Sequence, residues 1–425
     1  MKRKWMMVLF LLVCVSMALF AGGDQEKDGQ DEKVTLKLWR MGTQENWVTY
    51  TKSFIADFEA THPNIEVEYE YMPPVDLPQK LNTAFVAGIG PDIIGCSIQH
   101  TSEYAAKGKF LELDDYVDNW AAKDDVMESM LNTAYFNDNY YALAYHPDPY
   151  VFVYRKDLFR KAGLDPEDPP ESWEELLEVA PQLTERDGEI VTRAGFLMPI
   201  DDFLTFVPFA VMNGASYISD DNMPTFNQPE WVEALEVLTK LVKDERVTIE
   251  TTNNMEWTTS SFAKGNAAIA QVNSTMVDTF KKSYPELKDD VGFFAIERER
   301  KSNWNGAWLF AISADSKHPD EAFEFISEWF SPEAMWNMYE ATGNLPVLKS
   351  LEERFSAVDP ELNSALFSGV EHGLGNPLVP WATLQIAAIR KAMGEAFYGE
   401  KTPKQALEDN YELLLNEMKE AGYLD

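Results

Sequence analysis

The segment from residue 34 to residue 71 constrains the fold most, because it switches between the periodicities of strand and helix. Val34-Thr-Leu-Lys-Leu-Trp39 alternates apolar and polar residues as a strand does, and so does Ile65-Glu-Val-Glu-Tyr-Glu-Tyr71. Between them, residues 47–60 place apolar side chains at helical spacing, and His62-Pro-Asn64 ends that helix. A strand, a helix and a strand in this order form a right-handed crossover with parallel strands. The chain is therefore predicted to be an α/β protein.

The same alternation continues beyond this unit and returns later in the chain. Leu77 to Ala87 has helical spacing, Gly88-Ile-Gly90 ends that helix, and Pro91-Asp-Ile-Ile94 forms the next short strand. Residues 230–243 form an amphipathic helix. Its apolar face consists of Trp231, Ala234, Leu235, Leu238 and Leu241. A length of 425 residues corresponds to two or three domains of roughly 100–200 residues each.

The amino terminus has the three parts of a secretory signal peptide. Met1-Lys-Arg-Lys4 is basic, Met6 to Leu19 is apolar, and Ala21-Gly-Gly23 is small enough for cleavage. We expect residues 1–23 to be removed, because the apolar stretch is shorter than the roughly 20 residues that span a bilayer. An uncleaved anchor is the alternative, and lipid attachment at Cys14 is another, which the bulky residue before it disfavours. The mature protein is then periplasmic or otherwise extracytoplasmic.

The residues after the leader separate it from the folded body. Residues 24–33 are polar and of low complexity, so they are predicted to form a flexible tether, and the fold begins at Val34. Removing the leader leaves Cys96 as the only cysteine, and no intramolecular disulfide can form. Cys96 follows a short apolar strand, so we expect a buried, unreactive thiol.

The charge of the chain excludes some partners. The formal net charge is −35 at pH 7, and a surface of this kind repels nucleic-acid backbones and anionic lipid. No nucleic-acid partner is therefore expected, whereas a neutral or cationic ligand is allowed. Solubility alone would also account for the acidity.

Several strings, in their order and spacing, resemble one family over nearly the whole chain after the leader. The longest reads as a strand, a turn at His146-Pro147 and a second strand that leads into a helix. The strings are Tyr140 to Phe159, Phe58 to Val67, Gly90 to Ile94, Phe262 to Ala270, Asn305 to Ile312 and Lys317 to Ile326. Together they resemble the extracellular solute-binding proteins of family 1, the sugar-binding components of ABC transporters that are similar to maltose-binding protein.

This resemblance implies a two-lobe periplasmic-binding-protein fold of type II, a hinged clamp whose chain crosses between the lobes three times. The crossings would fall near residues 144–147, 303–306 and 341–345. Lobe one would comprise residues 34–144 plus 306–341, and lobe two residues 145–305 plus 342–425. A ligand that contacts both lobes would then stabilise the closed state.

Holding a sugar needs aromatic faces for its C–H bonds and planar polar groups for its hydroxyls. The chain has 12 Trp and 17 Tyr residues. Trp39 ends the first strand, beside Gln44 and Glu45, where ligands of open α/β sheets usually lie. Core packing is the competing interpretation for each Trp. The other aromatic candidates in expected loops or at crossings are Trp257, Trp304, Trp308 and Trp381.

The polar candidates follow the same logic. At the place where the family commonly has a Gly, this chain has hydrogen-bonding side chains, in the run Val272-Asn-Ser-Thr-Met276. Asn273 and its neighbours could contact ligand there, or could cap a helix. The remaining polar candidates are Asp92, His146, Asp148, Asp202 and Asn305.

Other functions are weighed against sugar binding. Asp201 and Asp202 invite comparison with the paired acids of a secreted glycoside hydrolase, but 71 acidic residues make such a pair common in solvated turns. Five scattered His residues show no metal-ligand spacing, so no metal, no cofactor and no enzymatic reaction is expected. A polyamine, an amino acid or a peptide in the same clamp remains the alternative ligand. The resemblance implies a monomer that delivers carbohydrate to permease subunits at the inner membrane.

Overall fold

A computed structural model describes residues 33–199, 202–243, 247–248 and 255–424, except the side chains of residues 255–257. The expected leader, nearly all of the expected tether, and Asp201 lie outside the described residues. Within the described ranges, no helix combines the length and the apolar character needed to cross a bilayer.

One sheet gathers the strands expected at the start of the chain. β1 pairs in parallel with β2 from Val34 opposite Ile65 to Met41 opposite Met72, and β3 joins β1 in parallel on its other side. The strand order is β13-β12-β3-β1-β2, and β6 pairs with β12. The parallel crossover predicted from residues 34–71 is confirmed. The strands are β1 (Val34–Met41), β2 (Ile65–Met72), β3 (Ile93–Ser97), β6 (Leu143–Pro149), β12 (Asn303–Ile312) and β13 (Gly373–Leu374).

A second sheet carries the middle of the chain, in the order β11-β7-β10-β9-β8. β10 is parallel to β9 and antiparallel to β7. The strands are β7 (Val151–Arg155), β8 (Glu185–Asp187), β9 (Ile190–Leu197), β10 (Ala267–Val272) and β11 (Val291–Phe294). A separate hairpin consists of β4 (Tyr135–Phe136) and β5 (Asn139–Tyr140).

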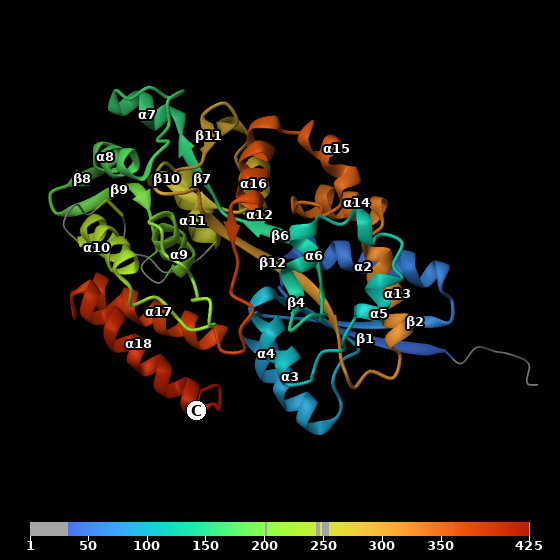
Figure 1. Cartoon of the computed structure of the whole chain (residues 1–425). Coiled ribbons are helices and arrows are strands. Elements are labelled where there is room, and N and C mark those ends of the chain that lie inside the picture. The colour runs from blue at the N-terminus through green and yellow to red at the C-terminus, as the bar shows by residue number, and fades with distance from the viewer. Residues whose placement is uncertain (1–32, 200–201, 244–246, 249–254, 425) are drawn as a thin grey trace, which may run out of the picture.

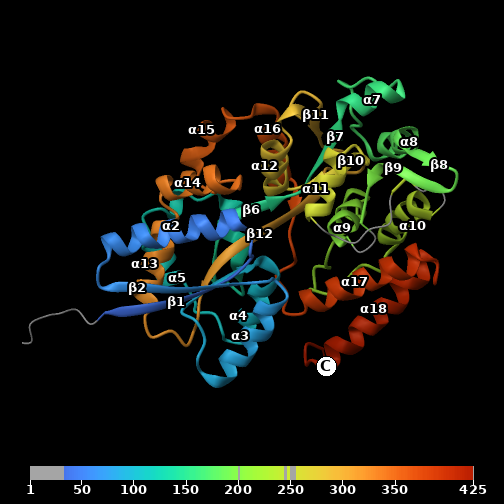
Figure 2. The same ribbon diagram turned by 180° about the vertical axis from the view of Figure 1, so that it is seen from behind.

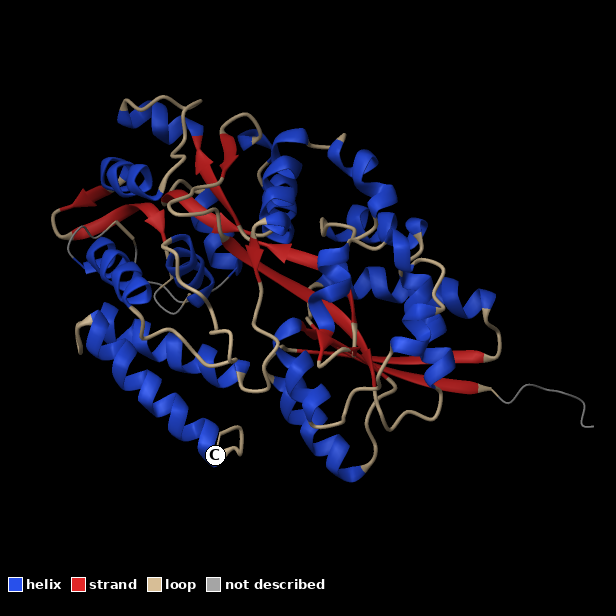
Figure 3. Ribbon diagram, viewed as in Figure 1, coloured by secondary structure: helices blue, strands red, loops and turns tan. Residues whose placement is uncertain are grey.

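Helices cover both sheets, as Figure 3 shows by colour. On the first sheet, the ring of Phe54 in α2 lies 4.6 Å from Trp329 and 5.2 Å from Phe325, both in α13. The helices of the first part of the chain are α2 (Glu45–Thr61), α3 (Asp76–Ala87), α4 (Thr101–Ala106), α5 (Asp114–Asp118) and α6 (Glu128–Leu131). Those of the middle part are α7 (Lys156–Ala162), α8 (Trp173–Leu183), α9 (Phe203–Met212), α10 (Pro229–Lys243), α11 (Met255–Ala263) and α12 (Ser274–Ser283). Those of the last part are α13 (Pro319–Trp329), α14 (Pro332–Thr342), α15 (Glu352–Ser356), α16 (Pro360–Glu371), α17 (Ala382–Phe397) and α18 (Pro403–Glu420).

The two sheets and their helices form two bodies joined by long strands (Figures 1 and 2). α17 and α18 pack together beside α10, which ties the end of the chain to the second sheet. The apolar face predicted for residues 230–243 is confirmed, because its five residues are the buried residues of α10.

The turn expected at His146-Pro147 is wrong. Both residues lie inside β6, where they pair with Trp308 and Ala307 of β12, and the chain leaves this strand only at Tyr150. Among the described strands, β6 pairs only with β12. A proline in β6 therefore removes no hydrogen bond on its other edge.

Cys96 is fully buried in β3, and burial raises the pKa of its thiol to about 12. The thiolate is the reactive form, so the predicted unreactive thiol follows from its position. We expect protein lacking residues 1–23 to give no reaction with a thiol reagent while folded, and one thiol per chain after unfolding. Rapid labelling of the folded protein would contradict this burial.

Candidate ligand-binding site

A pocket of about 380 Å³ lies where the two sheets meet. One side comes from the carboxyl end of β1, the start of α2, β6 and β12, and the other from the start of α12 and the turn after α14. We call it the aromatic pocket. Its lining residues are Arg40, Met41, Gln44, Trp47, His146, Asp148, Asn273, Thr275, Trp308 and Asn344. The carboxyl end of β1 is where ligands of open α/β sheets usually bind.

Three flat rings stack along one side of the aromatic pocket. The His146 ring lies 5.1 Å from Trp47 at 24° and 6.0 Å from Trp308 at 25°. Burial lowers the pKa of His146 to about 3, and its Nδ1 lies 3.0 Å from the carbonyl oxygen of Pro147. A neutral imidazole therefore donates from Nδ1 to that carbonyl, and it serves as a flat surface.

Arg40 packs against the Trp47 ring of this stack. Its Nε and Nη2 donate to the hydroxyl of Tyr145 at 3.0 and 2.8 Å, and its Cζ lies 4.0 Å from the centre of the Trp47 ring. Only 2% of Arg40 is exposed. A Cβ at Gly95 would lie 2.6 Å from the Cγ of Arg40, so glycine at this position makes room for the arginine.

Asp148 links the two sides of the pocket. It lies on β6, within hydrogen-bonding reach of Asn273 at the start of α12 and of Trp308 on β12. Burial raises the pKa of the Asp148 carboxyl to about 7, and the two hydrogen bonds oppose part of this rise. Asn273 has a second role, because its Oδ1 accepts from the backbone N–H of Met276 at 2.9 Å. The prediction that Asn273 could cap a helix is confirmed, because it is the N-cap of α12.

A wider groove adjoins the aromatic pocket, and Gln44 and Thr275 line both. Its volume is about 820 Å³. We call it the hydroxyl groove. Its lining residues are Gln44, Thr259, Ser260, Thr275, Met276, Thr279, Ser283 and Tyr284.

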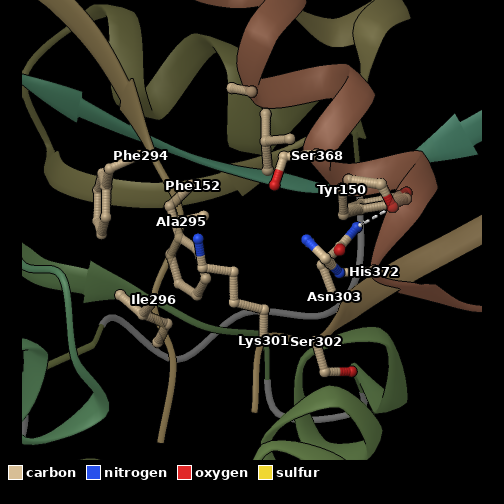
Figure 4. A pocket seen from close by; sticks show the side chains of 13 residues that line it. Tyr150, Phe152, Phe294, Ala295, Ile296, Lys301, Ser302, Asn303, Ser368 and His372 are labelled. Atoms are coloured by element: carbon tan, nitrogen blue, oxygen red, sulfur yellow. Dashed lines mark hydrogen bonds between the residues drawn. The ribbon is translucent and has the colours of Figure 1, made fainter.

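A third hollow, of about 300 Å³, lies where the chain passes between the sheets. Figure 4 shows Phe152, Phe294 and Ile296 on one side of it and Asn303 and His372 on the other. Asn303 Nδ2 donates to the carbonyl oxygen of Gly369 in α16 at 2.9 Å. This contact holds α16 against the start of β12, near the crossing.

Five of the predicted site residues come together in the aromatic pocket: Gln44, His146, Asp148, Asn273 and Trp308. They come from segments spread over 265 residues of sequence, between Gln44 and Trp308. Their gathering makes this pocket the candidate site.

Three other predicted residues lie outside the lining of this pocket. Trp39 points to the opposite face of β1 from Arg40, and Lys80 Nζ lies 4.1 Å from its ring centre. Glu45 is exposed in the first turn of α2. Asp92 precedes β3 and accepts from the backbone N–H of Lys37 at 2.9 Å and from Ser316 Oγ at 2.6 Å. Asp92 therefore stabilises the amino-terminal end of the sheet.

The remaining predicted residues are also placed elsewhere. Asp202 caps α9, accepting from the backbone N–H of Leu204 at 3.1 Å. Trp304 and Trp381 are buried in the core around the second sheet. Asn305 is buried in β12, and its Oδ1 has no hydrogen-bond partner among the residues that the structure describes. The side chain of Trp257 lies outside the described residues.

The pocket is also lined by Arg40, Trp47 and Asn344, which are not among the candidate residues predicted from the sequence. The sequence contains a signal that could have identified Arg40. Leu36, Leu38 and Arg40 lie on the same face of β1, and a charged side chain at the end of a buried face needs a hydrogen-bonding or charged partner. Asn344 accepts from Thr275 Oγ1 at 3.0 Å, a contact across 69 residues that no local pattern contains.

Two α/β bodies joined by crossing strands, with a lined pocket between them, define a hinged binding protein of the type II class. The chain belongs to the family of bacterial extracellular solute-binding proteins, whose family model matches residues 43–336. Within the described residues, no group of three or more His, Cys, Asp and Glu side chains is placed to hold a metal ion.

Similar proteins agree with this assignment. The mannitol-binding protein of Pseudomonas aeruginosa is 26% identical over 397 residues, which cover 86% of this chain and 89% of that protein. The sn-glycerol-3-phosphate-binding periplasmic protein UgpB of Escherichia coli is 25% identical over 284 residues, covering 61% of this chain and 62% of that protein.

Solved structures share the fold at lower identity. An ABC transporter solute-binding protein from Thermotoga lettingae bound with α-D-tagatose has a TM-score of 0.80 at 22% identity, over 90% of this chain and 98% of that one. Maltose-bound MalE3 of T. maritima has a TM-score of 0.78 at 21% identity, over 90% and 99% of the two chains. The expected type II periplasmic-binding-protein fold is confirmed.

Proposed function

We propose that this protein captures a mono- or oligosaccharide in the aromatic pocket and delivers it to the permease of an ABC importer. The observation that carries the proposal is the stack of Trp47, His146 and Trp308 beside Asp148 and Asn273. The ring faces suit the C–H bonds of a pyranose, and the carboxyl and amide groups suit its hydroxyls. The names of the mannitol-binding relative and of the tagatose- and maltose-bound structures support a polyhydroxylated ligand.

The clamp itself is part of the proposal. We assign residues 34–144 plus 306–341 to lobe one and residues 145–305 plus 342–425 to lobe two. The separation of β1, β2 and β3 from the five strands of the second sheet supports this division, although β6, β12 and β13 of the first sheet extend beyond the proposed boundaries of lobe one. Trp47 belongs to lobe one and Asn273 to lobe two in this division, so a ligand that contacts both would favour closure. Export from the cytoplasm, an inner-membrane permease as partner and a monomeric state belong to the same proposal.

Two of the alternatives, a polyamine ligand and a glycosidase mechanism, fit this pocket less well. Arg40 places a buried positive charge at its edge, which opposes a polyamine. A two-acid glycosidase mechanism needs a pair of carboxyl groups. Among the described residues that line the aromatic pocket, Asp148 is the single acid. A binding role without catalysis is therefore proposed.

The test is a thermal-shift screen of protein lacking residues 1–23 against sugars, polyols, polyamines and amino acids. A ligand at 100 times its dissociation constant should add about 2.7 kcal/mol to the free energy of unfolding. A shift with one class of sugars supports the proposal. A shift with amines alone would assign the alternative ligand, and consumption of a sugar during incubation would contradict the binding role.

Trp308→Ala should weaken binding of the sugar found in that screen by about 30-fold, or about 2 kcal/mol, because it removes one ring of the stack. Isothermal titration measures the change. Trp39→Ala is the matched control, since Trp39 is also half-buried but lies outside the pocket. The affinity of this variant for the same sugar should stay within about twofold of the wild-type value. The opposite ranking of the two variants would move the site to the other face of β1.

A further inference from the structure

The hydroxyl groove continues the aromatic pocket along α11 and α12. Gln44 and Thr275 line both hollows, so the two are contiguous. The aromatic pocket has a volume of about 380 Å³. The groove, at about 820 Å³, has more than twice that volume. A ligand that filled only the aromatic pocket would leave the larger part of this space empty.

One face of α12 gives the groove its chemistry. Thr275, Thr279 and Ser283 follow one another at intervals of four residues, which places their hydroxyls in a row along the helix. Thr259 and Ser260 of α11 add further hydroxyl groups, and Gln44 adds an amide from the other side. A hydroxyl both donates and accepts hydrogen bonds, so this row can pair with sugar hydroxyls in either orientation.

The described residues that line the groove are also uncharged, unlike the chain as a whole. Charged residues make up 25% of the sequence, so composition alone would place about two among eight lining residues. None of the eight is Asp, Glu, Lys or Arg. Thr279 and Ser283 are exposed, and Lys or Glu there would favour the helix more than Thr or Ser does. Helix stability and solubility therefore do not explain these residues, whereas contact with a neutral ligand does.

We propose that the ligand is a neutral oligosaccharide, with one sugar unit in the aromatic pocket and at least one more along the hydroxyl groove. The inference rests on the proposed function, because it extends the ligand from that site. It favours a chain of sugars over a single sugar or a polyol. A phosphate or an ammonium group along the groove would meet no opposite charge among the lining residues.

The test compares affinities within series of increasing length. Isothermal titration would use mannitol, mannose, mannobiose and mannotriose, and glucose, maltose and maltotriose. We expect a di- or trisaccharide of one series to bind at least tenfold more tightly than its monosaccharide and than mannitol. A monosaccharide or mannitol that binds as tightly as every longer member would overturn the inference.

Thr279→Trp tests the place of the second unit. The indole should fill the groove and reduce the advantage of the longer sugar over its monosaccharide to less than about threefold. Ser283→Trp blocks the same groove one turn further along α12, in case the first variant does not fold. Thr83→Trp is the matched control, because Thr83 is an exposed helical threonine on α3.

The outcomes separate this inference from the proposed function. An unchanged length preference in both groove variants, with binding still sensitive to Trp308→Ala, would overturn the groove and leave the sugar pocket standing. If no sugar in either series binds, the proposed function itself fails, and the inference falls with it.

Discussion

Trp47→Ala should lower the free energy of unfolding by about 3–5 kcal/mol, the usual cost of deleting a large buried ring. Trp47 is 5% exposed, and its ring stacks on His146 and contacts Tyr145 at 5.9 Å. It also covers Arg40, whose hydrogen bonds go to tyrosine hydroxyls. Removing the ring leaves both a cavity and a buried cation that has lost its aromatic cover. Urea denaturation measures the change.

Two further variants show whether the ring itself is responsible. Trp47→Phe keeps an aromatic face over Arg40 and should recover more than half of the loss. Trp39→Ala removes the same side chain from the other face of β1, where it is only partly buried, and should cost about 1 kcal/mol. Equal losses for Trp39→Ala and Trp47→Ala would contradict the packing described for the pocket.

This contrast between two tryptophans illustrates what the sequence could and could not predict. The periodicity of residues 34–71 determined the strands, the helix and their parallel pairing, because each signal lies within one element. Trp39 looked like a site residue because it ends a strand, but alternation places it on the face opposite Arg40. Trp47 reads as one apolar residue of a helix, and only its packing on His146 assigns it to the pocket.

The same limit applies to the crossing strand. A proline in a strand pattern usually marks a turn, and Pro147 was interpreted in that way. Whether β6 lies at a sheet edge depends on β12, which is more than 150 residues away in the sequence. Long-range pairing of this kind decides between a turn and a continuing strand, and a single sequence carries no local signal for it.

Asp148 should make the stability of the folded protein depend on pH between about 4 and 7. In the unfolded chain an aspartate has a pKa of about 3.9, whereas burial raises the pKa of Asp148 to about 7. Between these values the folded protein holds a proton that the unfolded chain has released. The contribution of Asp148 to stability is therefore fully present below pH 4, falls as the pH rises to 7, and is lost above it.

Asp148→Asn removes this titration and should make the protein more stable than the wild type by about 2–4 kcal/mol at pH 8, with little difference at pH 4. Urea denaturation of both proteins at several pH values gives the difference. The comparison is necessary because His146, whose pKa is lowered to about 3, adds an opposite slope below about pH 6.5 in both proteins. Curves that stay parallel from pH 4 to 8 would contradict the burial of this carboxyl.

Trp308→Phe provides an independent check on the same group. Phenylalanine keeps a ring beside His146 but has no indole N–H, so it cannot form a hydrogen bond with the Asp148 carboxyl. Because that bond favours the ionised form, its loss should raise the pKa of Asp148 further and move the stability transition to higher pH. A transition that stays in place, or moves to lower pH, would mean that the indole N–H does not bond the carboxyl. The ring stack and the carboxyl are thus coupled through one side chain, so changes to the ring stack should also alter the pKa of Asp148.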